Sequence, residues 1–363
     1  MQGARVADDQ QGELFARVNE DEPARLQPNL PPEIASPLAP FHGVKPPAPK
    51  WFADALADKP EVSFVPVRGA NIELLTWGPR GKPGLIFVHG NSAHARWWSF
   101  IAPFFAAEFR VAALSLSGMG GSDWREAYSF DLFAEEIFAC GQAAGLFSAP
   151  ALPVYIGHSF GGAQVLHSAV RHPERMRACI LVDTGFGGPP TPEEFEKLRA
   201  EALARGEDVG AWGPRLSQRS GRNRVYPSLA AALTRFRFMP PQVPGNLFIA
   251  DYIARHSLKQ APLPPAEEGS SQGWTWRFDP GLWTKLDRTG MAAGKDVQKA
   301  KVPLVHVYGD RSEIIRRHDF RGARGVPASV PSVVIPDSEH HIMVDQPLAL
   351  VAALRALLRV WAP

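Results

Sequence analysis

The sequence Gly-His-Ser-Phe-Gly at residues 157–161 constrains the fold of this chain more than any other feature. It follows the apolar run 153–156 and precedes a helix-like stretch at 162–171. A G-x-S-x-G sequence between a strand and a helix is typical of a sharp turn, where glycines avoid the collisions that a Cβ atom would cause. Such a turn holds Ser159 in a strained conformation and lifts its hydroxyl clear of the sheet. We therefore predict that Ser159 is a nucleophile.

Short apolar runs alternate with helical patterns along most of the chain. Residues 62–67 and 71–77 alternate apolar and polar side chains on either side of a turn, which predicts an antiparallel hairpin. Six further runs are short and mostly apolar, and helical patterns such as 129–145 separate them. We predict an α/β fold with a mostly parallel, eight-stranded sheet and helices on both of its faces. The six runs are 85–88, 110–116, 154–156, 180–182, 304–308 and 332–335.

Two regions depart from this pattern. Residues 1–60 are rich in proline, which disfavours long helices, and we interpret them as an N-terminal arm. Residues 61–185 and 300–363 carry the alternating core pattern. Between these two parts, residues 186–299 contain helical patches and many aromatic residues, which predicts a helical lid insertion. We interpret the basic stretch 215–237 within it as a solvated face of the lid.

Composition and charge exclude several classes of partner. The net charge of +2 is too small to indicate nucleic acid or an anionic membrane surface. No run approaches the roughly 18 apolar residues of a membrane span, and residues 1–17 lack the apolar core of a secretory signal. The two cysteines, Cys140 and Cys179, lie among apolar neighbours, so we expect buried free thiols and a reducing cytoplasm.

A serine nucleophile needs a base, a group that orients the base, and donors for the oxyanion. His340 follows the last predicted strand and precedes the C-terminal helix, which makes it the candidate base. His341 is its competitor, because adjacent side chains point to different sides. The N–H of Phe160, at a helix N-terminus, and that of Asn91, in the loop after a strand, are the candidate oxyanion donors.

The acidic partner of the base is the open assignment at this stage. Asp183 ends the strand that follows the helix after Ser159. Asp310 and Glu313 follow the next predicted strand of the core. All three carboxylates belong to strand ends near the expected position of His340, and the residues alone leave all three open.

At this point the motifs resemble the α/β-hydrolase superfamily, and more closely its lid-bearing esterase, epoxide-hydrolase and haloalkane-dehalogenase-like branch. The similarity runs from about residue 62 to the C-terminus, and the lid is matched only loosely. Epoxide hydrolases and dehalogenases of this branch use an aspartate nucleophile, so Ser159 argues against those activities. The matching motifs are 89–91, 117–122, 157–162 and His340, seven residues before Pro347.

The resemblance also bears on the acid. The commonest acid position of the family holds Ser312 in this chain. Esterase relatives with a serine there take the acid from the end of the preceding strand, which corresponds to Asp183. The resemblance therefore implies Asp183 as the acid and Ser312 as its supporting hydrogen-bond partner, with Glu313 and Asp310 as alternatives. Ser115 stands where the family usually has an aspartate.

We predict a serine hydrolase with a Ser-His-Asp triad, and most specifically a carboxylic ester hydrolase acting on small to medium apolar esters. The aromatic-rich lid carries the expectation of an apolar pocket. Arg96, Trp97 and His158 are candidate pocket residues, and Arg96 is a candidate ligand for a substrate carboxylate. The alternatives are a carbon–carbon bond hydrolase or a lactonase with the same triad, and a non-catalytic ligand-binding protein on the same fold.

The expected partner is a small-molecule substrate. Neither nucleic acid nor a membrane is expected, and a homodimer stays open because the arm can wrap either its own domain or a second subunit. No cofactor is expected, since serine, histidine and carboxylate complete the chemistry alone. No metal is expected either, because no cluster of His, Asp or Glu has ligand spacing.

Overall fold

The computed structural model describes residues 30–186, 200, 222–263, 272–289, 293–318 and 329–361. The first half of the predicted arm, and residues 187–199 and 201–221 of the predicted insertion, lie outside the described residues. The basic stretch that was predicted at 215–237 is therefore described only from residue 222, and Arg222, Arg224 and Arg235 are exposed there.

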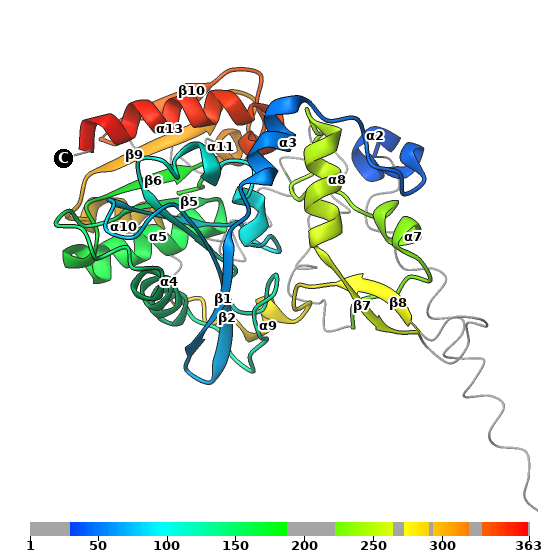
Figure 1. Cartoon of the computed structure of the whole chain (residues 1–363), viewed down its shortest axis with the longest axis horizontal. Helices are drawn as coiled ribbons and strands as arrows, with labels where there is room; N and C mark the ends of the chain where they lie inside the picture. The colour runs from blue at the N-terminus through cyan, green and yellow to red at the C-terminus, as the bar shows by residue number, and fades with distance from the viewer. Residues whose placement is uncertain are drawn as a thin grey trace, which may run out of the picture.

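The core is an eight-stranded sheet in the order β1-β2-β4-β3-β5-β6-β9-β10 (Figure 1). The β1–β2 and β2–β4 pairs are antiparallel, and the five other pairs are parallel. The predicted eight-stranded, mostly parallel sheet is confirmed. The strands are β1 Glu61–Val67, β2 Ala70–Trp77, β3 Gly84–Val88, β4 Arg110–Leu114, β5 Val154–His158, β6 Ala178–Val182, β9 Leu304–Gly309 and β10 Ser332–Ile335.

Continuous apolar strands form the centre of the sheet because both of its faces are buried. Along β4, Val111 and Ala113 belong to one apolar cluster, whereas Ala112 and Leu114 belong to the other. Successive side chains of a strand point to opposite faces, so a strand that is covered on both sides needs apolar residues at every position.

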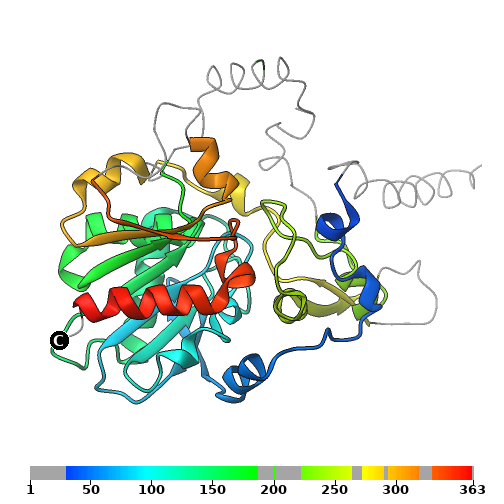
Figure 2. The ribbon, with the colours of Figure 1, turned by 90° about the horizontal axis from the view of Figure 1, so that it is seen from above.

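Helices cover the two faces from opposite sides (Figures 1 and 2). On one face α4 (Phe130–Ala144), α5 (Phe160–Arg171) and α10 (Ala293–Lys299) pack together. The other face is covered by α13 (Pro347–Trp361), whose Leu350 belongs to the opposite cluster. The sequence pattern thus produces the three layers that were predicted.

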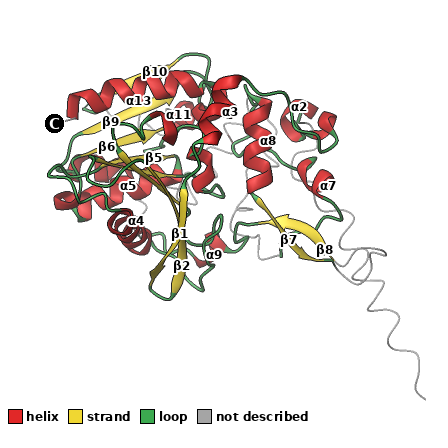
Figure 3. Ribbon diagram, in the orientation of Figure 1, coloured by secondary structure: helices red, strands yellow, loops and turns green. Residues whose placement is uncertain are grey.

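The insertion between β6 and β9 contains α7 (Leu229–Leu233) and α8 (Leu247–His256). It also contains an antiparallel pair, β7 (Leu258–Pro262) and β8 (Gln272–Trp276), which corrects the prediction of a purely helical insertion (Figure 3). Inside-outside alternation along β8 buries Gly273 and Thr275, and alternation of this kind indicates a strand. The element α9 (Leu282–Lys285) instead joins the apolar cluster beneath α4 and α5.

The described part of the N-terminal arm joins the core to the insertion. It contains α2 (Pro32–Ala35) and α3 (Lys50–Ala57), and both views show it beside the insertion (Figures 1 and 2). The ring of Phe52 is buried, with its centroid 5.6 Å from that of Phe100 in the core and 4.9 Å from that of Phe248 in α8. The remaining elements are η1 Ala39–Phe41, η2 Ala95–Trp98, η3 Ala102–Phe104, η4 Pro173–Arg175, α11 Glu313–His318 and α12 Ile342–Asp345.

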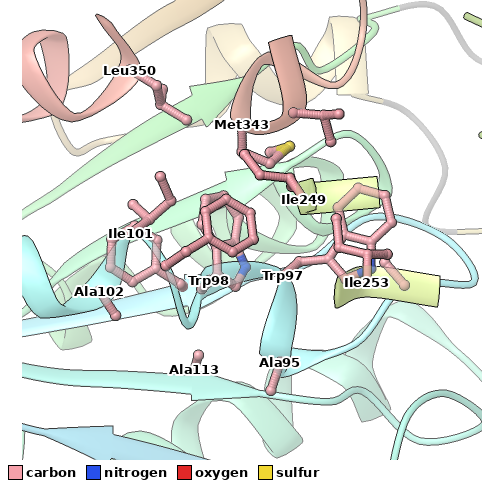
Figure 4. Close-up of a cluster of buried hydrophobic side chains, with 14 of the residues drawn as sticks. Ala95, Trp97, Trp98, Ile101, Ala102, Ala113, Ile249, Ile253, Met343 and Leu350 are labelled. Carbon is pink, nitrogen blue, oxygen red and sulfur yellow. The ribbon is translucent and has the colours of Figure 1, made fainter. Parts of the chain in front are cut away.

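A buried cluster fixes the insertion on the core. Trp97 and Trp98 of η2 lie beside Ile249 and Ile253 of α8, with Met343 of α12 above them (Figure 4). Every residue of this group is at most 7% exposed. Burying one large apolar side chain to this extent stabilises the folded state by roughly 1.5–3 kcal/mol. The insertion is therefore anchored by apolar packing next to the carboxyl edge of the sheet.

Two expectations from composition can be compared with this structure. Cys140 and Cys179 are buried free thiols, as predicted. Over the described ranges, no helix combines the length and the apolar character that crossing a membrane requires.

Candidate active site

The turn predicted at Ser159 is present between β5 and α5. Ser159 has φ 53° and ψ −118°, a conformation that L-residues rarely adopt, and its N–H donates to Val182 O at 2.9 Å. A Cβ atom on Gly161 would lie 2.3 Å from the His89 carbonyl oxygen, and one on Gly157 would lie 2.5 Å from the Gly161 carbonyl oxygen. Only glycine therefore permits the strand, the turn and the helix to approach so closely.

His340 and Asp183, which come from the two separate segments of the core sequence, form a buried pair. His340 Nδ1 lies 2.8 Å from Asp183 Oδ1, and the two side chains are 3% and 0% exposed. The same Oδ1 accepts from the Ser312 hydroxyl at 2.5 Å, and Oδ2 accepts from the Gly309 N–H at 2.9 Å. Three donors therefore hold the carboxylate and fix the His340 ring with Nδ1 as its donor.

The other two candidate acids lie elsewhere. Asp310 is exposed, and its Oδ1 accepts from the Ser338 N–H at 3.2 Å, so it supports the loop that leads to His340. Glu313 is exposed at the start of α11. Among the described residues, Asp183 is the carboxylate that is hydrogen-bonded to the His340 ring.

Ser159 lies beside the strand end that carries Asp183, since its N–H donates to Val182 O. Within the described part of the chain, no hydrogen bond joins Ser159 Oγ to the His340 ring. The ring of the adjacent His158 has its centroid 4.8 Å from that of His340, and His158 Nε2–H donates to His340 O at 3.0 Å. Ser159 is therefore the neighbour in sequence of the residue whose ring packs against His340.

His341 points away from the Asp183 carboxylate. Its N–H and its Nδ1–H both donate to Gln242 Oε1, at 2.9 and 2.5 Å. Burial, reinforced by the neighbouring rings of His340 and His158, holds the pKa of His341 well below its usual range. Gln242 comes from the insertion, and the sequence analysis did not find it because it belongs to no motif.

The loop after β3 lies against the turn at Ser159. A Cβ atom on Gly90 would lie 2.9 Å from His158 Nδ1 and 3.3 Å from Ser159 Cβ, so glycine allows the loop to approach the turn this closely. His89 fastens the loop, since its Nδ1–H donates to Gly90 O at 2.7 Å and its Nε2 accepts from the Leu116 N–H at 3.0 Å. Burial lowers the pKa of His89 to about 4, so the ring is neutral at neutral pH.

The two candidate oxyanion donors belong to the helix after Ser159 and to the loop after β3. Phe160 is the first residue of α5, and the partly buried Asn91 follows Gly90 in the loop. In the described ranges, neither of these two backbone N–H groups takes part in a hydrogen bond, so both are free to face an acceptor. The positive end of the α5 dipole adds to the attraction for negative charge there.

The carboxylate of Glu73 in β2 supports Ser115, which follows the neighbouring strand β4. Ser115 stands where the family usually has an aspartate, and its hydroxyl donates to Glu73 Oε2, from β2, at 2.7 Å. Ser115 Oγ also accepts from the Ala95 N–H at 2.9 Å. Glu73 therefore holds the Ser115 hydroxyl, and Ser115 in turn holds the backbone at Ala95.

The candidate pocket residues have different surroundings. Trp97 is 7% exposed, and its ring centroid lies 5.8 Å from that of Phe238 and 5.4 Å from that of His341. Arg96 is partly exposed, and its Nη2 lies 3.9 Å from Glu73 Oε1. His158 is buried against His340, as described above. Where the structure describes the chain, no three His, Cys, Asp or Glu residues converge as metal ligands.

Comparison with known proteins gives the family. The model of the alpha/beta hydrolase family matches residues 85–354 of the chain, which include every candidate residue named above from Gly90 to His340. The chain belongs to this family. The fold and the family predicted from the sequence motifs are therefore confirmed.

Individual members of the alpha/beta hydrolase family resemble the chain to different extents. Esterase Rv0045c of Mycobacterium tuberculosis is 26% identical over 316 residues, which covers 82% of this chain and 89% of that protein. Lipase LipV of the same organism is 31% identical over 151 residues, which covers 39% of this chain and 56% of that protein. The solved thioesterase domain from the curacin biosynthetic pathway shares the fold, with a TM-score of 0.60 and 21% identity over 82% of this chain and 99% of that domain.

Proposed function

We propose that the chain is a serine ester hydrolase in which Ser159, His340 and Asp183 form the catalytic triad. The observation that carries the proposal is the buried hydrogen bond of 2.8 Å between His340 Nδ1 and Asp183 Oδ1, beside a serine in a strained turn. An aspartate on Nδ1 keeps Nε2 unprotonated, which is the form a general base needs. The similarity to proteins named esterase and lipase supports an ester as the substrate.

The first half of the reaction acylates the serine. Ser159 Oγ attacks the ester carbonyl carbon while His340 Nε2 takes the hydroxyl proton. The Asp183 carboxylate stabilises the imidazolium that forms and does not itself take the proton. When the tetrahedral intermediate collapses, the C–O bond to the alcohol breaks and His340 gives its proton to the leaving oxygen.

The second half releases the acid. A water molecule attacks the acyl carbon while His340 Nε2 takes one of its protons, and collapse returns a proton to Ser159 Oγ. In both halves the N–H groups of Phe160 and Asn91 donate to the oxyanion. Removing one such donor typically costs on the order of 10²–10³ in kcat, because the charge develops in a site from which water is excluded.

The surroundings support a small to medium apolar ester. The rings of Trp97 and Phe238 lie within 6 Å of each other next to His341, and Met343 belongs to the same buried cluster. Apolar walls with few polar groups are typical of pockets that bury an apolar ligand. The acyl or alkyl group of the substrate would lie against these side chains.

Replacement of the nucleophile tests the proposal. Ser159→Ala should abolish turnover of p-nitrophenyl butyrate and prevent stoichiometric labelling by a fluorophosphonate probe. The matched control is Ser168→Ala, because Ser168 is a buried serine of α5 whose hydroxyl donates to Gln164 O within the helix. The control should retain turnover to within about twofold.

The same assay separates the alternative reactions. A lactone and a vinylogous diketone are measured beside the simple ester with the wild-type chain. A higher kcat/KM for the lactone or for the diketone would identify that compound's class as the substrate, with the same triad. Retained ester turnover in Ser159→Ala, or labelling of another residue, would overturn the triad itself.

A further inference from the structure

A polar cavity of about 240 Å³ lies between the core and the insertion. The core contributes Glu73, His94 and Arg96 with the backbone at 120–121, and the insertion contributes His256 and Arg277. The volume is far above the roughly 10–15 Å³ that one water molecule needs. None of the three proposed triad residues lines this cavity.

Two guanidinium groups and one carboxylate set the charge of the cavity at neutral pH. Burial, together with the nearby Arg96 and Arg277, lowers the pKa of His256 to about 4, so its ring is neutral. Burial also holds the pKa of His94 well below its usual range, and its Nε2–H donates to Ser257 Oγ at 3.0 Å. The cavity therefore carries an excess of one positive charge.

The Glu73 carboxylate does not hold either guanidinium by a hydrogen bond. Its Oε2 accepts from the Ser115 hydroxyl at 2.7 Å and from the Gly121 N–H at 2.9 Å. Arg96 Nη2 is 3.9 Å from Oε1, beyond hydrogen-bond distance. Arg277 Nε donates to Leu258 O at 3.0 Å, and across the described residues its two terminal nitrogens make no hydrogen bond.

We propose that this cavity binds the carboxylate of a small organic anion between Arg96 and Arg277. A guanidinium presents two parallel N–H groups that match the two oxygens of a carboxylate, and such charge-assisted pairs are roughly twice as strong as neutral hydrogen bonds. One arginine belongs to η2 of the core and the other follows β8 of the insertion. A bound carboxylate therefore links the insertion to the core.

Direct binding tests the cavity without any turnover. Succinate is titrated by calorimetry into the full chain carrying Ser159→Ala, so the result does not depend on the proposed hydrolysis. Saturable binding of one succinate is expected. Arg96→Gln and Arg277→Gln should each weaken it about tenfold or more, since each removes a charge-assisted pair. Arg235→Gln, which removes an exposed arginine of the same insertion, should leave it unchanged.

A variant of opposite sign excludes a general folding defect. Glu73→Gln removes the one negative charge of the cavity, so it should tighten succinate binding several-fold. A damaged fold would weaken binding in every variant and cannot reproduce an increase. Absence of saturable binding, or equal affinity in the two arginine variants and the wild type, would overturn the proposal.

Kinetics then identify the source of the carboxylate, on the assumption that the proposed ester hydrolysis holds. Wild type and Arg96→Gln are compared on a p-nitrophenyl ester with a terminal carboxylate and on its neutral methyl analogue. A loss of about tenfold in kcat/KM confined to the charged ester assigns the cavity to the substrate. If Arg96→Gln changes kcat/KM by the same factor for both esters, and succinate binds in the titration, the cavity is assigned to a separate anion. Both results support a carboxylate site.

Discussion

Asp183→Asn removes the charge of the proposed acid while keeping its shape. In the native site Oδ1 accepts from His340 Nδ1–H and from the Ser312 hydroxyl, and Oδ2 accepts from the Gly309 N–H. The Gly309 donor cannot turn, so the amide oxygen of the variant must face it. The amide nitrogen then faces His340 and Ser312, and both can accept, because the hydroxyl rotates and the imidazole changes tautomer.

This rearrangement gives partners to the Gly309 N–H and to both amide hydrogens, whereas the opposite orientation leaves the Gly309 N–H without an acceptor, at a cost of about 1–3 kcal/mol. In this arrangement the His340 ring carries its proton on Nε2, so Nε2 cannot accept the proton of Ser159. The equivalent change in a serine protease lowers kcat about 10⁴-fold. We expect a loss of the same order, about 5 kcal/mol of transition-state stabilisation at 1.36 kcal/mol per tenfold.

The assay is kcat for p-nitrophenyl butyrate, combined with the imidazole nitrogen shifts of His340 in an isotope-labelled chain. The thermal midpoint should change little, because the packing of the site is kept. Asp310→Asn is the matched control, since Asp310 is exposed and an amide oxygen can still accept from the Ser338 N–H. More than a tenth of wild-type kcat in Asp183→Asn, or an equal loss in Asp310→Asn, would refute the reasoning.

Three further predictions concern stability. Gly162→Ala should lower the free energy of unfolding in urea by about 3 kcal/mol, because its Cβ would lie 1.8 Å from Thr184 Oγ1 in a packed core. Gln242→Ala should lower it by about 2 kcal/mol, because two donors of the buried His341 lose their acceptor. Stability should fall as the pH drops from about 6.5 to about 4, since the pKa of His89 is about 4 in the folded chain and 6.5 is its ordinary value. The unfolded chain then binds the proton first, which costs on the order of 3 kcal/mol at pH 4, measurable by urea unfolding at several pH values.

Each of these predictions has its own control. Gly141→Ala, in the middle of α4, meets no atom closer than 3.4 Å and should not destabilise the chain. For Gln242, the control is Gln346→Ala, because the Gln346 amide is partly exposed and lies 3.5 Å from its acceptor, Asp337 O, so its removal should cost much less stability. For the pH effect, a variant with His89→Gln should show a weaker dependence between pH 6.5 and 4. The same slope in this variant would show that other groups cause the effect.

The sequence patterns predicted the strands of the sheet closely, because burial selects the side chains along each strand. The eight apolar or alternating runs correspond to β1–β6, β9 and β10, since burial on one or both faces selects those side chains directly. The turn at Ser159 was predictable because the glycine motif stands between a strand pattern and a helix pattern, although the atom that requires Gly161, the His89 carbonyl oxygen, comes from the loop after β3. The β7–β8 pair was missed, since a short two-stranded sheet in an aromatic-rich insertion leaves a weak periodic signal.

By itself, the sequence determined the strands, the strained serine and the position of the histidine loop after the last strand. Only the tertiary structure decided that the Asp183 carboxylate is hydrogen-bonded to His340. It also decided that Glu73 accepts from Ser115 after the neighbouring strand, and that Arg96 and Arg277 line one cavity. The reason is physical: strands and turn glycines leave a pattern in a short stretch of sequence. A hydrogen bond across 157 residues exists only once the sheet order and the insertion have brought its two ends together.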